Sequence, residues 1–203
     1  MAARVFHEKG YDGASIQDLA DALGMLKGSL YYYIDSKEDL LFDVLRSAHE
    51  DARANIALTD AHPGDALQRV RLFMRLHVLF NLRNLDRMGV FSNDFRSLRP
   101  DRRDEIRAYR NEYFAFAKRL IVDAQEARLA CPDLDPTLTA LAFIGMSNWV
   151  YEWYRPERGA APEEIAESYA DLAVAGIHCT PATHTPGHRA ALAAISRPAA
   201  RAG

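Results

Sequence analysis

Residues 15–41 read SIQDLADALGMLKGSLYYYIDSKEDLL. Counted from position 16, a small residue, Ala20, falls fifth, a glycine, Gly24, falls ninth and an apolar residue, Leu30, falls fifteenth. A small side chain lets two helices cross closely, glycine tolerates the positive φ of a tight turn, and the leucine points back into the core. This spacing predicts a helix-turn-helix.

The outer face of the second helix of this motif carries hydrogen-bond donors and aromatic rings, which suit phosphates and base edges. Its members are Lys27, Gly28, Ser29, Tyr31, Tyr32 and Tyr33. A small core beneath it is predicted from Phe6, Ile16, Leu19, Leu23 and Leu30.

Helical periodicity continues along the chain, and no run of alternating apolar and polar residues indicates a strand, so we predict an all-α fold. Ser15 and Ser36 are each followed three residues later by an aspartate, as at helix N-termini. The predicted helices cover residues 1–9, 15–24, 26–33, 36–58, 64–81, 83–96, 101–129, 136–154 and 162–177. We expect a DNA-binding domain over 1–48, a helical ligand-binding and dimerisation domain over 49–178 and a flexible tail over 179–203.

The stretch 24–41 resembles the recognition-helix signature of the TetR family of bacterial transcriptional repressors, G-V-S-K-G-T-L-Y-Y-Y-F followed by S-K-E-x-L. Residues 6–15, FHEKGYDGAS, are similar to the exit of that family's first helix. The resemblance implies a homodimer that places one recognition helix of each subunit in successive major grooves of a palindromic operator on double-stranded DNA.

Carried over by position, the resemblance implies DNA contacts from Ser15, Gln17, Lys27, Gly28, Ser29, Tyr31, Tyr32, Tyr33 and Lys37. Lys37, Tyr32 and Ser15 are expected to contact phosphates, and Lys27, Ser29 and Tyr33 to read bases. Tyr31 could equally pack under the helix. Leu26 stands where the family usually has a capping serine, so the third helix is expected to begin without a side-chain cap.

The net charge of −3 lies entirely in the first 48 residues, which carry five basic and eight acidic side chains. Attraction to phosphates is therefore expected to be weak and sensitive to salt. Because family members begin with a basic arm and an earlier part of the first helix, we expect such an arm to precede residue 1.

The long helices after Pro63 hold many aromatic residues, which fit either a bundle core or a pocket for a large apolar ligand. The candidate pocket residues are Phe73, Leu76, Phe80, Met88, Phe91, Phe95, Tyr113, Phe116, Phe143, Met146 and Trp149.

Helix 136–154 is apolar nearly all round and must be buried on two sides, so one side is expected to face a partner subunit together with the last helix. The predicted dimer interface comprises Val150, Trp153, Ile165, Tyr169, Leu172 and Gly176. The strings 148–156, NWVYEWYRP, and 162–166, PEEIA, are similar to TetR-type regulators of fatty-acid and steroid catabolism, which respond to acyl-CoA thioesters.

An acyl-CoA effector needs cations for its phosphates, and residues 83–110 hold eight arginines against five acids. The alternative, which the sequence favours, is a solvated helix face with local ion pairs.

Sequence motifs for catalysis are missing: there is no GxSxG, GxGxxG, Walker loop or HExxH, so we expect no enzyme, no cofactor and no metal site. Cys131 and Cys179 lack metal-ligand spacing and are expected to be reduced thiols. With no membrane span and no signal peptide, we expect a cytoplasmic protein. A different function also fits, namely a helical small-molecule or acyl-chain binding protein without DNA binding.

Overall fold

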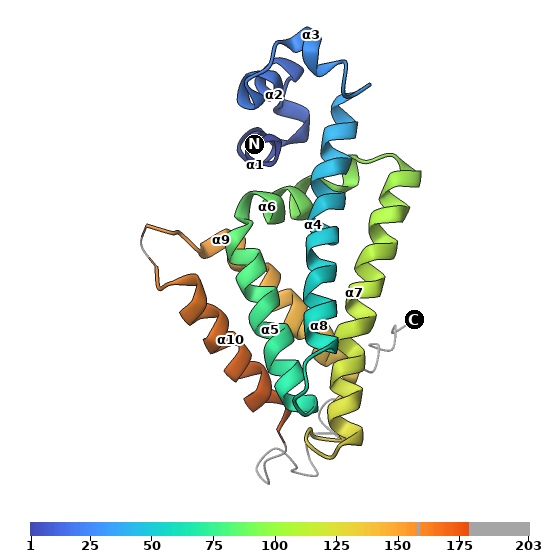
Figure 1. Cartoon of the computed structure of the whole chain (residues 1–203), viewed down its shortest axis with the longest axis vertical. Coiled ribbons are helices and arrows are strands. Elements are labelled where there is room, and N and C mark those ends of the chain that lie inside the picture. Colours follow the sequence, from blue (N-terminus) through green and yellow to red (C-terminus); the bar gives the residue numbers. More distant parts are fainter. Residues whose placement is uncertain (158, 179–203) are drawn as a thin grey trace, which may run out of the picture.

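The computed structural model describes residues 1–157 and 159–178, and every regular element in these ranges is a helix (Figure 1). The all-α expectation is confirmed. The predicted tail 179–203, with Cys179, lies outside the described residues. Within those residues, no helix is both long and apolar enough to cross a membrane.

Three short helices form the N-terminal end of the molecule: α1 (Ala2–Gly13), α2 (Ile16–Leu23) and α3 (Lys27–Leu30). Gly10 kinks α1 with a φ of 71°, and Gly24 ends α2 in the left-handed conformation with a φ of 69°. At the start of α2, Asp18 N–H donates to Ser15 Oγ at 3.1 Å while Ser15 N–H donates to the Asp18 carboxylate at 2.9 Å. This reciprocal cap fixes where α2 begins.

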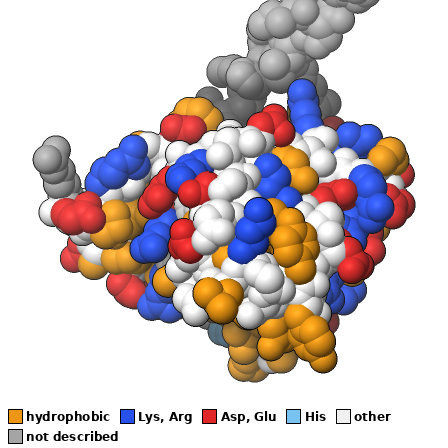
Figure 2. Space-filling model, turned by 90° about the horizontal axis from the view of Figure 1, so that it is seen from above, with side chains coloured by type: hydrophobic (Ala, Val, Ile, Leu, Met, Phe, Trp, Pro, Cys, Tyr) orange, Lys and Arg blue, Asp and Glu red, His pale blue; other side chains and the backbone are white. Residues whose placement is uncertain are grey.

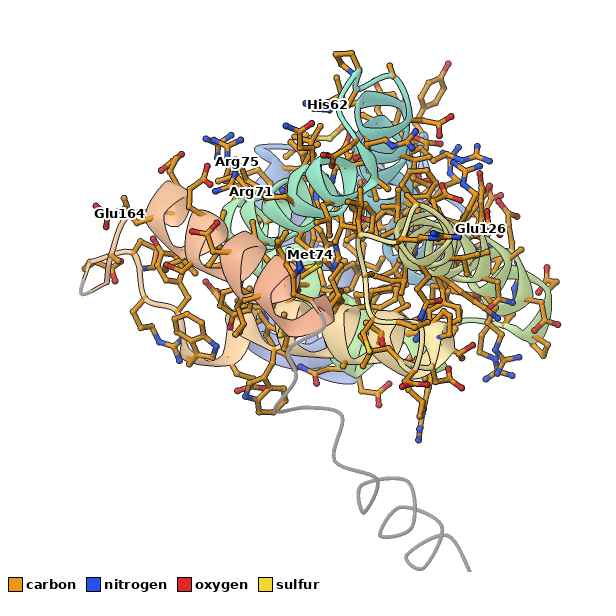
Figure 3. All side chains as sticks on the ribbon, turned by 90° about the horizontal axis from the view of Figure 1, so that it is seen from below. His62, Arg71, Met74, Arg75, Glu126 and Glu164 are labelled. Carbon is orange, nitrogen blue, oxygen red and sulfur yellow. The ribbon has the colours of Figure 1, made fainter. Side chains whose placement is uncertain are left out.

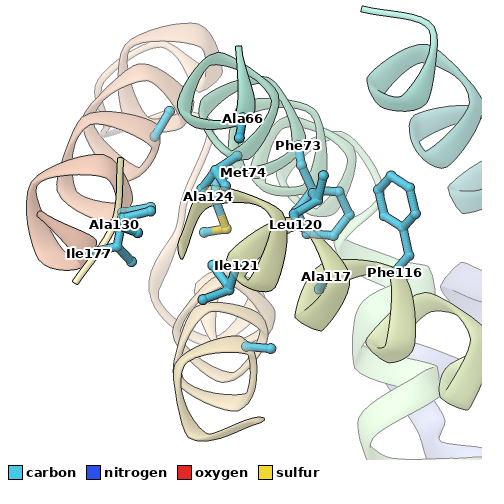
Figure 4. Close-up of a cluster of buried hydrophobic side chains, with 14 of the residues drawn as sticks. Ala66, Phe73, Met74, Phe116, Ala117, Leu120, Ile121, Ala124, Ala130 and Ile177 are labelled. Atoms are coloured by element: carbon cyan, nitrogen blue, oxygen red, sulfur yellow. The ribbon is translucent and has the colours of Figure 1, made fainter. Parts of the chain in front are cut away.

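The remaining elements of the described chain are α4 (Lys37–Asp60), α5 (Ala66–Arg83), α6 (Leu85–Asp94), the 3-10 turn η1 (Phe95–Ser97), α7 (Pro100–Glu126), α8 (Pro136–Asn148), α9 (Val150–Trp153) and α10 (Pro162–Ile177). Their main core gathers apolar side chains from α5, α7, α8 and α10 (Figure 4). Met74 and Ile121, exposed by 0% and 1%, lie at its centre.

Ion pairs run along the outer edge of the α5–α10 contact. Arg71 and Arg75 of α5 both contact Glu167 of α10, and Arg83 contacts Glu163 at 2.7 Å. Figure 3 shows Arg71 and Arg75 on the side of α5 beside α10. Residues later in α5 pair with residues earlier in α10, which shows that the two helices are antiparallel.

Several predicted helix ends differ from the structure; helix 1–9, for example, continues across the kink at Gly10 to Gly13. Helix 26–33 is helical only over 27–30, and residues 31–33 form a turn. As expected, the helix begins after Leu26 without a side-chain cap. Helix 101–129 ends at Glu126 because Arg128 adopts a left-handed φ of 59°, which lets Leu129 N–H reach back to Ala124 O at 2.9 Å.

The predicted helix 136–154 is broken at Trp149, between α8 and α9. The Asn81 side chain of α5 donates to Ser147 O at 3.1 Å. That carbonyl would otherwise accept from the main chain one turn later, so the side chain of a neighbouring helix competes with the helical hydrogen bond.

The three N-terminal helices share a core with the larger domain. Phe6, Leu19 and Leu30 pack in one buried cluster with Val90 of α6 and Ile106 of α7. Helix α4 runs without interruption through residue 48, so the predicted domain boundary falls inside a helix.

Candidate nucleic-acid interface and effector cavity

Three tyrosines at the end of α3 extend into solvent. The exposed fractions of Tyr31, Tyr32 and Tyr33 are 50%, 85% and 71%. The rings of Tyr32 and Tyr33 meet edge to face with centroids 5.4 Å apart. Leu30, only 2% exposed, anchors the turn that carries them. Clustered aromatic rings on a surface indicate a partner, and these rings can contact sugars and base edges.

The other predicted contacts of the third helix, Lys27, Gly28 and Ser29, are also exposed. At Gly28 no atom lies within 4 Å of where a Cβ would be, so the backbone there is open to a close approach. The structure thus places the six predicted residues of this helix and its turn on one exposed end of the molecule, where their DNA contacts remain a prediction.

The predicted contacts of the second helix already have intramolecular partners. The Ser15 hydroxyl donates to the Asp18 carboxylate at 2.8 Å, and the Gln17 amide donates to Asp21 at 2.7 Å. Both residues are exposed, so their remaining hydrogen-bonding groups still face solvent.

Lys37, the predicted phosphate contact of α4, has its ammonium turned toward the end of α1. It donates to Tyr11 O at 2.6 Å and Ala14 O at 2.8 Å, and lies 4.4 Å from the centroid of the Tyr11 ring. These contacts satisfy carbonyls at the end of α1. Lys37 therefore joins α1 to α4, a structural role that the sequence did not reveal.

Charge at this end of the molecule is mixed. Seen from above, positive and negative side chains are interspersed and form no single basic patch (Figure 2). Lys9 contacts Asp18 at 2.6 Å, and the hydrogen bonds from Lys9 and Ser15 hold the pKa of Asp18 well below its usual range. Phosphate attraction must then come from the few unpaired cations, such as Lys27.

A cavity of about 450 Å³ lies between α4, α5, α6, α7 and α8. Four of the predicted pocket residues line it: Phe80, Met88, Phe91 and Tyr113. The remaining lining residues are Ala48, His49, Ala52, His77, Asn81, Arg107, Arg110, Asn111, Phe114, Leu141, Ile144 and Asn148. The cavity has the size and the mainly apolar walls of a small-molecule site.

The other predicted pocket residues lie elsewhere. Phe73 and Phe116 are buried in the main core, and Phe143 and Met146 pack against that core. Leu76 lies half-buried on α5 away from the cavity lining, and Phe95 packs in the N-terminal cluster. Trp149 is 60% exposed at the break between α8 and α9. The prediction that these seven residues line the cavity is wrong, since they lie in the core or on the surface. Helical periodicity identifies the apolar face of a helix but not which turn of that face reaches a cavity.

The sequence analysis did not predict the polar side chains of the cavity. His77 and Asn81 are 6% and 0% exposed and follow Phe73 at intervals of four residues on one face of α5. The sequence signal for this site was the pair of polar residues in line with an apolar helix face. A buried polar group needs a hydrogen-bond partner, so such a pair indicates a polar contact inside the protein. Burial lowers the pKa of His77 to about 4, so its ring is neutral at pH 7.

His49 of α4 lies at another wall of the cavity. Its ring is 5.5 Å from Phe91 and 5.8 Å from Tyr109, between centroids. Burial, and to a lesser degree the charge of Arg110, lowers the pKa of His49 to about 4.

Most arginines of residues 83–110 form ion pairs. Five pair with carboxylates, namely Arg83, Arg87, Arg99, Arg102 and Arg107. Arg110 differs because its guanidinium lies over the rings of Phe91 and Phe95, 5.0 and 5.4 Å from their centroids, with no carboxylate at ion-pair distance in the described part of the chain. It lines the cavity beside Arg107. Only the Arg107–Asp104 pair is local, as the sequence interpretation expected; the other four pairs join residues far apart in the sequence, and Arg110 remains an unpaired cation of the cavity.

Two family models match this chain. Residues 1–44 match the bacterial regulatory proteins of the tetR family, and residues 63–177 match the tetracyclin repressor-like C-terminal domain. The chain belongs to the TetR family. TetR proteins are transcriptional regulators and not enzymes, as the sequence indicated.

Individual relatives span nearly the whole TetR chain. It is 28% identical over 185 residues to the HTH-type transcriptional repressor KstR2 of Mycobacterium tuberculosis, covering 87% of this chain and 89% of the relative. The regulator PfmR of Thermus thermophilus is 30% identical, with a TM-score of 0.78 over 88% of this chain and 94% of that one. AibR, solved with isovaleryl coenzyme A and operator DNA, is 28% identical, with a TM-score of 0.75 over 84% and 92%.

The predicted dimer interface of this TetR protein is only partly available to a partner. Val150 is 0% exposed and packs within the protomer against Val78 and Leu82, which removes it from the interface. Ile165 and Tyr169 pack partly against the same cluster. Leu172 and Trp153 are 58% and 46% exposed, and Gly176 is open. Leu138 on α8 and Trp149 at the end of that helix are further exposed apolar side chains.

Proposed function

We propose that this protein is a transcriptional repressor that binds a palindromic operator as a homodimer in the cytoplasm and is released by an acyl-CoA. The observation that carries the effector class is the combination of a mainly apolar cavity with the unpaired Arg110 at its wall. An acyl chain suits the apolar walls, and the anionic groups of coenzyme A suit a guanidinium.

The exposed end of α3 supports the DNA-binding part of the proposal. Tyr32, Tyr33 and Lys27 are exposed at one end of the molecule. In a two-fold dimer, two such ends can enter successive major grooves. AibR, which is similar over 84% of this chain, was solved with operator DNA and isovaleryl coenzyme A.

Helix α6 joins the cavity to the DNA-binding helices. Met88 and Phe91 of α6 line the cavity. On the same helix, Asp94 accepts a hydrogen bond from Tyr11 N–H of α1 at 3.0 Å. A methyl group on Gly89 would lie 2.0 Å from His7 Nδ1 of α1, so α1 and α6 are in close contact. A ligand that displaces Phe91 or Met88 therefore moves the surface on which α1 rests.

A gel-shift titration at low salt against DNA from upstream of the protein's own gene tests both parts. We expect a sequence-specific shift that is reversed by acyl-CoAs but not by free coenzyme A. A shift that acyl-CoAs leave unchanged rejects the effector class and retains the repressor.

An Arg110→Gln variant tests the role of the cation, with Arg96→Gln as its matched control. Arg96 is exposed on η1 and has no ion pair in the described residues. We expect Arg110→Gln to raise the acyl-CoA concentration needed for release by about tenfold or more, and Arg96→Gln to leave it unchanged.

The alternative function is a helical binder of acyl chains without DNA binding. The excess of acidic over basic side chains in residues 1–48 favours it. Acyl-CoA binding without any sequence-specific shift, at the lowest salt tested, selects this alternative.

A further inference from the structure

One end of the cavity holds two polar atoms that the protein leaves without a well-aligned hydrogen bond. His77 Nε2 and Asn81 Oδ1 are buried and make no hydrogen bond of good geometry among the described residues, although the Asn148 side chain lies within reach of the His77 ring. His77 and Asn81 both line the cavity and are four residues apart on α5. Side chains at this spacing are neighbours on a helix surface, so one small group can contact both.

The orientation of the Asn81 amide is fixed by its surroundings. Its nitrogen donates to Ser147 O at 3.1 Å and to Asn148 Oδ1 at 3.2 Å. Both acceptors lie on the nitrogen side, and a flipped amide would place oxygen against oxygen. Asn81 therefore offers the cavity a hydrogen-bond acceptor.

The tautomer of His77 follows from its other ring nitrogen. Nδ1 lies 3.0 Å from the Tyr113 hydroxyl. Burial raises the pKa of Tyr113 well above its usual value, so the phenol keeps its proton. A phenol is a better donor than acceptor, so Tyr113 donates to Nδ1 and the ring proton is on Nε2. His77 offers the cavity a hydrogen-bond donor.

A donor and an acceptor side by side fit a hydroxyl group, which can accept from one and donate to the other. A ketone would leave the Asn81 oxygen without a donor, and an ammonium would leave the His77 N–H without an acceptor. We propose that the effector carries a hydroxyl group that accepts from His77 Nε2 and donates to Asn81 Oδ1.

The position of this hydroxyl follows from burial. His77 and Asn81 are almost fully buried, whereas Arg107 and Arg110 line the cavity from an exposed part of α7. If the coenzyme A group stays at the arginines, as the proposed function requires, the hydroxyl is at the far end of the acyl group. The inference rests on that proposed function and specifies which acyl groups are recognised.

The test is titration calorimetry of the full chain with matched pairs of thioesters, in which a terminal hydroxyl replaces a methyl group. The pairs are 6-hydroxyhexanoyl-CoA with heptanoyl-CoA, 8-hydroxyoctanoyl-CoA with nonanoyl-CoA, and 10-hydroxydecanoyl-CoA with undecanoyl-CoA. We expect the hydroxylated member to bind about tenfold more tightly at the chain length that fits, because the methyl member leaves both protein groups unpaired.

A His77→Phe variant keeps the ring that stacks on Phe73, with centroids 5.9 Å apart, and removes the donor. It is expected to abolish the preference within the pair. Phe80→Leu, an apolar change in the same cavity, is expected to alter both affinities alike and keep their ratio.

Equal binding within every pair, or tighter binding of the methyl members, overturns the hydroxyl and leaves the acyl-CoA effector in place. Failure of all six thioesters to bind rejects the effector class, and the hydroxyl with it. The comparison within pairs uses the unchanged protein, so it decides the matter even if His77→Phe does not fold.

Discussion

The carboxylate of Asp94 on α6 accepts a hydrogen bond from the main-chain N–H of Tyr11 on α1, at 3.0 Å. Asp94 is 8% exposed, so this bond is made at a buried junction directly after the kink at Gly10. Replacing Asp94 by alanine leaves the Tyr11 N–H unpaired. We expect a loss of about 1–3 kcal/mol in the free energy of unfolding, measured by urea denaturation. Asp94→Asn retains an acceptor oxygen and is expected to lose less; equal losses would show that the hydrogen bond is not the cause.

Stability should fall in mild acid because of His49. Its pKa is lowered to about 4 in the folded protein, against an ordinary value of 6.5. Between these values the unfolded chain binds more protons than the folded protein. The neutral His49 therefore costs no stability above about pH 6.5, and the free energy of unfolding decreases as the pH falls toward 4. The expected contribution at pH 5 is up to about 2 kcal/mol.

Thermal unfolding at pH 7.5 and pH 5 measures this effect. His49→Phe keeps an aromatic ring against Phe91 and should reduce the change in melting temperature between the two pH values. His178→Phe, at an exposed position, should leave that change as it is. His77 contributes in the same direction, so part of the dependence remains in the His49→Phe protein.

Arg102 connects the start of α7 to the start of α4. It pairs with Asp39 and lies over the ring of Phe42, 5.0 Å from its centroid. Both charged side chains are 20% exposed, so the pair is poorly hydrated. Arg102→Ala is expected to destabilise the protein by about 1–3 kcal/mol, between the values for exposed and buried pairs. Arg107→Ala breaks the exposed pair with Asp104 and should cost less than about 0.5 kcal/mol in the same denaturation experiment.

Lys27 and Tyr33 should affect DNA binding in different ways. Lys27→Ala is expected to weaken binding of all sequences and to reduce the slope of log K against log salt by about one, as for a single phosphate contact. Tyr33→Ala is expected to lower the ratio of operator to non-specific affinity while leaving that slope unchanged. Fluorescence anisotropy over a range of salt concentrations separates the two. Both side chains are exposed, so melting temperatures should stay unchanged.

The apolar surface of α8 and α10 should hold the dimer together. Leu172→Asp places a charge in that surface and is expected to give monomers in sedimentation equilibrium. Leu58→Asp is the matched control, because Leu58 lies on α4 with almost the same exposure, 57% against 58%. Dimers that survive Leu172→Asp would assign the interface to another face.

The N-terminal motif could be predicted because its determinants are local. Ala20 and Leu30 are buried as their spacing requires, and Gly24 has the left-handed φ of the turn. The cap at Ser15 depends on a residue only three positions away. Interactions within one turn leave a readable pattern in the sequence.

The cavity was harder to predict because its form depends on contacts distant in the sequence. Asn81 reaches Ser147, 66 residues away, and this contact accompanies the break between α8 and α9. At the break, Trp149 is exposed and Val150 is buried. The sequence predicted the opposite, with Trp149 in the pocket and Val150 at the dimer interface. No periodicity within helix 136–154 contains that information.

The shared packing of Val90 and Ile106 with Phe6 and Leu19 limits how such regulators can be recombined. A chimera that exchanges residues 1–48 for those of another family member also exchanges one half of a buried core, while the other half stays behind on α6 and α7. The contacts of Gly89 and Asp94 with α1 would have to be matched at the same time. Rewiring the operator specificity of this protein therefore calls for substitutions on the exposed turn after α3, where no core residue has to change.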